Sequence, residues 1–92
     1  MLSALEVDIL TTLLNRELYG IQLLEKINRA RRMVGYTLLR SGSLYPKLNN
    51  LEKKRIILSK LEQTKKYYRL SSFGINVLKK RKEYLRLLAM KK

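Results

Sequence analysis

The spacing of apolar residues changes along this chain, and that change is the strongest restriction on what it can fold into. In residues 2–14 and 21–27 apolar side chains recur every three or four positions, as on one face of a helix. Residues 56–61 and 66–70 are instead β-branched or alternating, which is typical of strands. A helical pattern returns near the C-terminus. The sequence therefore predicts mainly α structure with a small β-hairpin or sheet.

Local signals set the expected ends of these elements. Ser3 and Glu6 have the spacing of a capping box, so a helix is expected to begin there. Pro46 is tolerated only in a first helical turn, which places the start of a later helix at Gly42 or Ser43. The expected elements are helices at 3–15 and 19–32, a short strand at 36–39, a helix at 43–54, strands at 56–61 and 66–70, and a helix that starts at Ser71 or Ser72.

This order of elements predicts a winged helix-turn-helix. Three helices with a tight connection before the third, then a hairpin, are typical of that fold. The inward side of the second helix is expected to carry Ile21, Leu24 and Ile27. Residues 1–71 are predicted to form a DNA-binding domain, and residues 72–92 a C-terminal helix that serves as a dimerisation element.

The charge is strongly positive and unevenly distributed. The chain carries 21 Lys and Arg against 7 Asp and Glu, a formal net charge of +14. Residues 1–52 hold a net charge of only +2, whereas residues 53–92 hold +12. One sign of charge concentrated in one half favours a polyanionic partner such as DNA, RNA or an anionic membrane.

The missing residue types argue against an enzyme. Cysteine and histidine are both absent, so the sequence predicts no thiolate or imidazole chemistry and no ordinary zinc site. The seven carboxylates are scattered, and no cluster offers the convergent oxygens of a Mg²⁺ or Ca²⁺ site. We expect no catalytic residue, no metal and no cofactor.

The N-terminal segment and the hydropathy predict a cytoplasmic protein without a membrane partner. No stretch approaches the 18 or more apolar residues of a membrane span. The first residues lead directly into an amphipathic pattern rather than a signal peptide.

Several short motifs resemble those of the PadR family of transcriptional regulators. They are Leu5-Glu6 with Ile9-Leu10, Tyr19-Gly20, Gly42-Ser43-Leu44-Tyr45-Pro46, Leu48 with Leu51-Glu52, Lys66-Tyr67-Tyr68-Arg69-Leu70-Ser71, and Gly74 with Leu78. The resemblance covers roughly residues 3–80 and is to the short form with a single C-terminal helix. It implies a dimeric winged-helix repressor that places the helix at 43–54 in the major groove and the wing at 56–70 along the backbone. It also implies small, often aromatic, effectors near the dimer interface, although the effector itself is unknown.

Two positions depart from the family pattern. Arg55 stands where similar proteins usually carry glycine after the third helix, so it either adopts a strained backbone or ends the helix differently. The wing is also short, with only Glu62-Gln63-Thr64-Lys65 at its tip. A phosphate contact by Lys65 or Lys66 is therefore expected rather than deep insertion into the minor groove.

The candidate DNA contacts follow from the residue types and from the resemblance. Ser43 is interpreted as an N-cap that can also hold a phosphate. Asn49 and Asn50 can read adenine and Lys47 can reach guanine, but a solvated polar face explains each of the three equally well. The full set is Tyr19, Ser41, Gly42, Ser43, Tyr45, Pro46, Lys47, Asn49, Asn50, Lys53, Lys54, Lys65, Lys66 and Tyr67.

Two alternatives remain open at this point. Tyr67 and Tyr68 are expected to point to opposite faces of a strand, so one of them should lie in the core. The other, if exposed, could stack on unpaired RNA or single-stranded bases. The last helix is longer than a small core requires, which favours dimerisation, but a basic amphipathic helix can also lie on a membrane surface. The predicted dimer contacts are Leu2, Leu5, Ile75, Leu78, Leu85 and Leu88.

Overall fold

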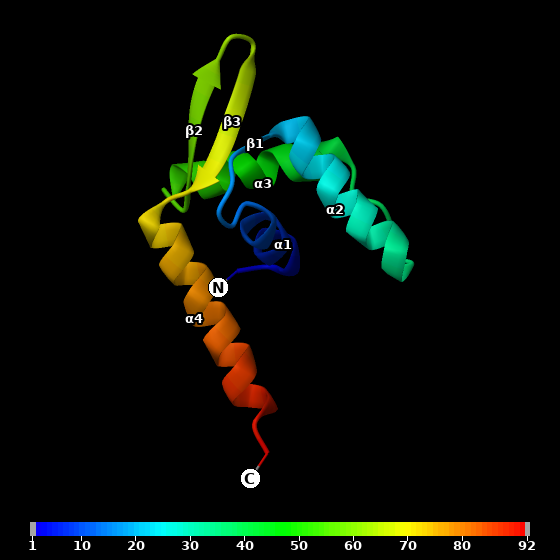
Figure 1. The fold of residues 1–92 in the computed structure, drawn as a ribbon, viewed down its shortest axis with the longest axis vertical. Coiled ribbons are helices and arrows are strands. Elements are labelled where there is room, and N and C mark those ends of the chain that lie inside the picture. Colours follow the sequence, from blue (N-terminus) through cyan, green and yellow to red (C-terminus); the bar gives the residue numbers. More distant parts are fainter. Residues whose placement is uncertain (1, 92) are drawn as a thin grey trace.

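The computed structural model describes residues 2–91, and this part of the chain forms a group of helices with a small antiparallel sheet, whose β2–β3 hairpin projects at one end (Figure 1). The expected fold class is confirmed. In chain order the elements are α1 (Ala4–Thr12), β1 (Leu18–Tyr19), α2 (Gly20–Val34), α3 (Ser41–Lys53), β2 (Ile57–Glu62), β3 (Lys65–Leu70) and α4 (Ser72–Ala89).

Side-chain caps begin the first and last helices where the sequence predicted them. The Ser3 hydroxyl accepts from the Glu6 N–H, and the Glu6 carboxylate accepts from the Ser3 N–H at 2.8 Å. Ser71 caps α4 by accepting from the Gly74 N–H at 2.9 Å. Both caps satisfy backbone donors that the first helical turn leaves free.

The short strand lies before α2 and not after it, so the strand expected at 36–39 is wrong. Within residues 2–91 that segment pairs with no strand. Instead the Asn28 side chain accepts from the Leu39 N–H at 2.6 Å and donates to the Leu39 carbonyl at 2.9 Å. The Asn28 amide thus provides the two hydrogen bonds that a neighbouring strand would otherwise make with the backbone of Leu39. Of the inward positions expected on α2, Ile27 is buried and Leu24 partly buried, but Ile21 is exposed and Leu23 takes its place in the core.

The third helix begins at Ser41, one or two residues before the expected start at Gly42 or Ser43. Arg40 is its N-cap, so Ser43 lies inside the first turn and does not cap the helix. Pro46 lies beyond the first turn, where it removes one backbone hydrogen bond. After α3, Arg55 adopts a left-handed backbone with φ of 59°, which is the strained alternative of the two considered and costs about 1 kcal/mol for a residue with a Cβ.

The core lies between the helices and one face of the sheet. The strand order is β1-β3-β2, with Leu18 opposite Tyr68 and Ile57 opposite Leu70. Tyr68 is buried and Tyr67 half-buried, as the alternation of a strand requires. The buried core consists of Ile9, Leu10, Leu13, Leu18, Leu23, Ile27, Leu39, Leu44, Leu48, Leu51, Ile56, Ile57, Tyr68, Leu70 and Leu78.

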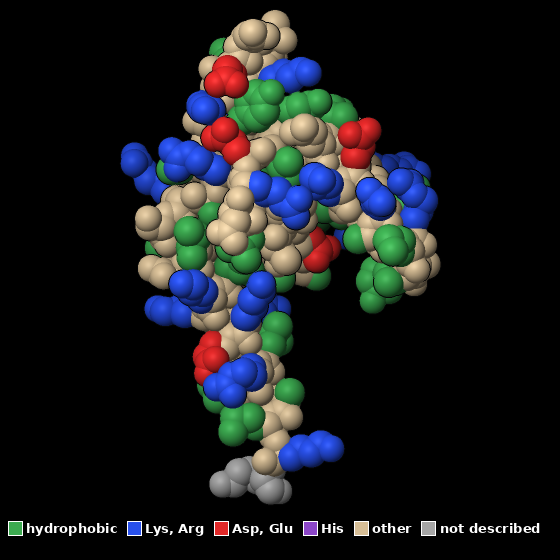
Figure 2. All heavy atoms as spheres, viewed as in Figure 1, with side chains coloured by type: hydrophobic (Ala, Val, Ile, Leu, Met, Phe, Trp, Pro, Cys, Tyr) green, Lys and Arg blue, Asp and Glu red, His purple; other side chains and the backbone are tan. Residues whose placement is uncertain are grey.

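Helix α4 enters the core only at its beginning. A Cβ at Gly74 would overlap the carbonyl oxygen of Ile56, so this helix can approach the body only because the residue is glycine. Leu78 is buried, and Arg81 donates to the Leu2 carbonyl at 2.8 Å. Beyond Arg81 the helix projects away from the body (Figure 1), and its apolar side chains from Tyr84 to Met90 are exposed (Figure 2).

Candidate nucleic-acid interface

The outer side of α3 carries a straight row of exposed residues. Leu44, Leu48 and Leu51 are fully buried on the inner side. With 3.6 residues per turn, Gly42, Pro46, Asn49 and Lys53 therefore align along the opposite side, and all four are exposed. The row presents the amide of Asn49, the ammonium of Lys53 and the exposed backbone of Gly42, and it contains no acidic residue.

Lys47 lies apart from this row, on the flank that faces α1. It is half-buried. Burial raises the pKa of Glu6, but hydrogen bonds from Ser3 and the charges of Lys47 and Lys54 outweigh it and lower the pKa. The position of Lys47 is less suited to reading bases than that of Asn49.

A hollow of about 230 Å³ lies between the wing (β2, β3 and their turn) and the beginnings of α2 and α3. Tyr19, Tyr45, Lys65 and Lys66 line it together, although they are up to 47 positions apart in the chain. Tyr45 reaches this place because α2 begins with Gly20, where a Cβ would overlap the tyrosine hydroxyl. Two phenol rings and two ammonium groups thus surround a space beside the N-terminus of α2.

The two lysines of the wing tip have different environments. The Lys65 ammonium lies 4.5 Å from the centre of the Tyr19 ring, and that ring makes an edge contact with Tyr67 at 5.4 Å between centroids. Lys65 has no carboxylate partner among residues 2–91. Its charge therefore remains available to a polyanion.

Lys66 is held by Glu52 at the end of α3. Its ammonium lies 2.9 Å from the Glu52 carboxylate, whose other oxygen accepts from the Ser59 hydroxyl on β2. The hydrogen bond from Ser59, followed by that from Lys66, lowers the pKa of Glu52, and the bond to Glu52 raises the pKa of Lys66. Glu52 thereby ties α3 to both strands of the wing, and it neutralises one of the two predicted phosphate contacts.

Other wing cations are also paired. Lys60 lies 3.4 Å from Glu17, and Arg69 lies 3.9 Å from the same carboxylate. These pairs join the wing to the segment before β1. Much of the positive charge counted on the hairpin is therefore compensated locally.

None of the fourteen predicted DNA contacts is fully buried, and four of them line the hollow under the wing. Exposed among them are Ser41, Gly42, Ser43, Pro46, Asn49, Asn50, Lys53, Lys54, Lys65 and Lys66, and half-buried are Tyr19, Tyr45, Lys47 and Tyr67.

The sequence did not identify Glu52 and Ser59 as residues that hold the wing, or Gly20 as the residue that makes room for Tyr45. Nothing in the sequence around Glu52 indicates which distant residues it contacts. The Tyr19-Gly20 pair was noted only as part of a family motif.

The described residues offer neither a metal site nor a membrane span. Residues 2–91 contain no group of three acidic, histidine or cysteine side chains that could hold an ion. Within the same range, every helix is too short or too polar to cross a bilayer.

The helix-turn-helix, the three-stranded sheet and the lysine-lined hollow beside the wing define a winged-helix protein of the kind that regulates transcription. Residues 9–80 match the PadR-like family of transcriptional regulators, and this chain belongs to that family. No curated protein matches the chain.

Three solved structures show the likeness. A PadR-like transcription factor from Bacteroides fragilis is 26% identical, with a TM-score of 0.80 over 91% of this chain and 82% of that one. A PadR-like transcriptional regulator from Bacillus cereus is 27% identical, with a TM-score of 0.78 over 92% and 84%. A PadR family transcription regulator from Clostridium difficile is 29% identical, with a TM-score of 0.70 over 89% and 88%.

Proposed function

We propose that this PadR-family regulator is a cytoplasmic homodimer that binds duplex DNA in a sequence-dependent way and represses transcription. The observation that carries the proposal is the exposed row of α3 beside the hollow under the wing. An α-helix fits the major groove, and a basic hollow at one end of it suits the phosphate backbone of the same duplex.

The residues divide into two groups by chemistry. Asn49 and Asn50 have the amide groups that can pair with adenine edges in the major groove. Lys53, Lys54 and Lys65 form no ion pair within residues 2–91, and their charges suit phosphates. The phenol hydroxyls of Tyr19 and Tyr45 can donate to the DNA backbone. Lys66 contributes less, because Glu52 already compensates it.

The distal half of α4 supports a dimer. Leu85 and Leu88 are 47% and 63% exposed, and Leu2 and Leu5 are only partly buried beside the same helix. Leu78, also predicted at the interface, is buried in its own chain. Residues 1–71 would then bind DNA while residues 72–92 join two copies, and two-fold symmetry would set half-sites about 34 Å apart.

The test is fluorescence anisotropy with a labelled duplex from the region upstream of the protein's own gene. A scrambled duplex and the matching single strand are measured beside it at two salt concentrations. We expect the upstream duplex to bind more tightly than both, with a slope of log affinity against log salt near −7 if each subunit neutralises about four phosphates.

Each result decides between functions. Equal, salt-sensitive binding to all three probes would overturn sequence-dependent recognition in favour of a general nucleic-acid binder. Preference for the single strand would favour the RNA or single-strand alternative. Repression is tested with a reporter under the same upstream region, where increased expression on adding the protein would mean activation.

A further inference from the structure

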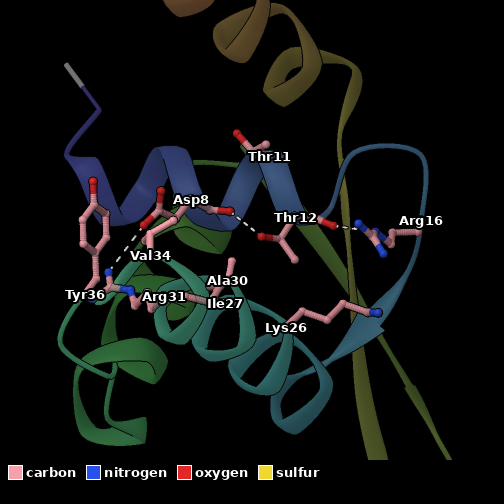
Figure 3. Close-up of a pocket in the computed structure, with 10 residues that line it drawn as sticks. All are labelled: Asp8, Thr11, Thr12, Arg16, Lys26, Ile27, Ala30, Arg31, Val34 and Tyr36. Carbon is pink, nitrogen blue, oxygen red and sulfur yellow. Dashed lines mark hydrogen bonds and ion pairs between the residues drawn. The ribbon is translucent and has the colours of Figure 1, made fainter.

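A groove of about 450 Å³ lies between α1 and α2, away from the wing (Figure 3). Its size is within the range of small-molecule sites. The floor is apolar and consists of Ile27, Ala30 and Val34, which lie on one side of α2. Seven helical positions separate the first of these residues from the last, so the floor is about 10 Å long.

The two ends of the groove differ in charge. At one end Lys26 points outward, while the Arg16 guanidinium points toward α1 and donates to the Thr12 carbonyl at 2.7 Å (Figure 3). Neither side chain forms an ion pair with another residue of the range 2–91. At the other end the charge of Asp8 is compensated by Arg31, 3.4 Å away. The groove is thus cationic at one end and neutral at the other.

The neutral end also has uncovered apolar surface. Val34 is 63% exposed and Tyr36 is 68% exposed, and both line the groove. A ligand with an apolar body would cover them while its anionic group stayed beside Arg16 and Lys26. The matching chemistry is a medium-chain carboxylate, with a charge at one end and an apolar chain about as long as the floor.

The same end of the groove is joined to the turn before α3. Arg31 donates to the Thr37 carbonyl at 2.9 Å, and Asn28 holds Leu39 through two hydrogen bonds. The next residue, Arg40, caps α3, and its carbonyl accepts from the Ser43 N–H at 3.0 Å. A ligand that covers Tyr36 therefore contacts the segment that sets the position of the recognition helix.

We propose that the α1–α2 groove binds a small amphipathic carboxylate and that its occupation shifts the turn at 36–40 and, with it, α3. Binding of the carboxylate in the groove does not depend on the proposed function. Only its effect on DNA binding rests on that function.

The site is tested by NMR titration of the full chain with three probes that share one chain length: octanoate, 1-octanol and octylamine. We expect octanoate to give saturable amide shifts at Thr12, Ala30 and Tyr36, and further shifts at Leu39 and Ser41. Octanol should bind at least fivefold more weakly, because it lacks the charge, and octylamine should bind more weakly still.

Three variants give the titration its controls. Ala30→Trp fills the groove and should abolish the shifts, whereas Lys26→Gln should weaken octanoate at least fivefold without changing octanol. Arg29→Gln removes a charge from the same helix outside the groove lining and should leave octanoate binding unchanged. Equal affinity for octanoate and octanol, or shifts confined to residues 84–90, would overturn the site.

The coupling has its own measurement. Saturating octanoate should change the Kd for the upstream duplex at least threefold in the wild type and not in Ala30→Trp. An unchanged Kd, with the NMR shifts present, would overturn the coupling alone. If no duplex binds, the proposed function fails while the NMR result still decides the site.

Discussion

Helices α3 and α4 have similar amphipathic patterns, yet the rest of the chain covers them very differently. On α3, Leu44, Leu48 and Leu51 are all fully buried. On α4, Leu78 is buried, but Leu88 is 63% exposed. The spacing of apolar residues therefore shows which side of a helix is apolar. The tertiary arrangement decides whether the same chain buries that side.

The first prediction concerns the leucines and has the largest expected effect. Leu48→Ala should lower the free energy of unfolding by about 2–5 kcal/mol, because it leaves a cavity in a closed core. Leu88→Ala should change the unfolding of the monomer by less than about 0.5 kcal/mol, since its side chain is mostly exposed. Urea denaturation at low protein concentration measures both.

In the proposed dimer the order of the two effects is reversed. Leu88→Ala should weaken self-association in sedimentation experiments, and it should remove any dependence of Tm on protein concentration. If Leu88→Ala destabilises the monomer as much as Leu48→Ala does, Leu88 must be buried by its own chain, and the contrast between α3 and α4 does not hold.

The second prediction uses one glycine from each helix. Gly74→Ala should destabilise the chain by about 1–3 kcal/mol, because the added Cβ meets the backbone of Ile56 and α4 must move away. Gly42→Ala has open space around its Cβ and should stabilise α3 by about 0.5 kcal/mol. Thermal unfolding of the two variants side by side measures the difference. Equal Tm values would mean that the start of α4 is free to shift.

Periodicity and capping signals were sufficient for most of the fold. The Ser3–Glu6 box, the cap at Ser71 and the buried leucines of α3 are local features, and the sequence predicted them. The strand was misplaced for a non-local reason. Residues 36–39 have β-type composition, but the vacant edge of β3 is taken by residues 18–19 and Asn28 satisfies Leu39 instead.

The candidate site was predictable in its residue types and not in its pairings. The row of α3 follows from the helix period. That Lys66 is compensated by Glu52, 14 positions away, depends on how the wing folds back on α3. Charge counted along a sequence overstates the charge that a polyanion meets, because such long-range pairs are not visible in it.

The third prediction compares an exposed lysine from each helix. Lys53→Ala should reduce the slope of log affinity against log salt by about 0.9 for each phosphate that the protein no longer neutralises, and by similar amounts on every duplex. Lys80→Ala removes the same charge from α4 and should leave the slope unchanged. Anisotropy over a salt series measures both variants. Equal changes of slope would place α4 against DNA and remove the assigned division between the helices.

The last prediction compares two glutamates and has the smallest expected effect. The pKa of Glu52 is lowered by hydrogen bonds from Ser59 and Lys66, and the pKa of Glu83 is lowered by those from Arg86. A lowered pKa contributes stability above the unfolded value near 4.5, and the contribution is lost as the pH falls through the folded value.

Glu52→Gln should therefore cost about 0.5–1 kcal/mol at pH 7, since it weakens a partly shielded tie between α3 and the wing, and the difference from wild type should vanish well below pH 4.5. Glu83→Gln should leave stability unchanged at both pH values, because its pair with Arg86 is exposed on the projecting part of α4. Urea denaturation at the two pH values measures this. A pH-independent loss in Glu52→Gln would mean that shape rather than charge holds the wing.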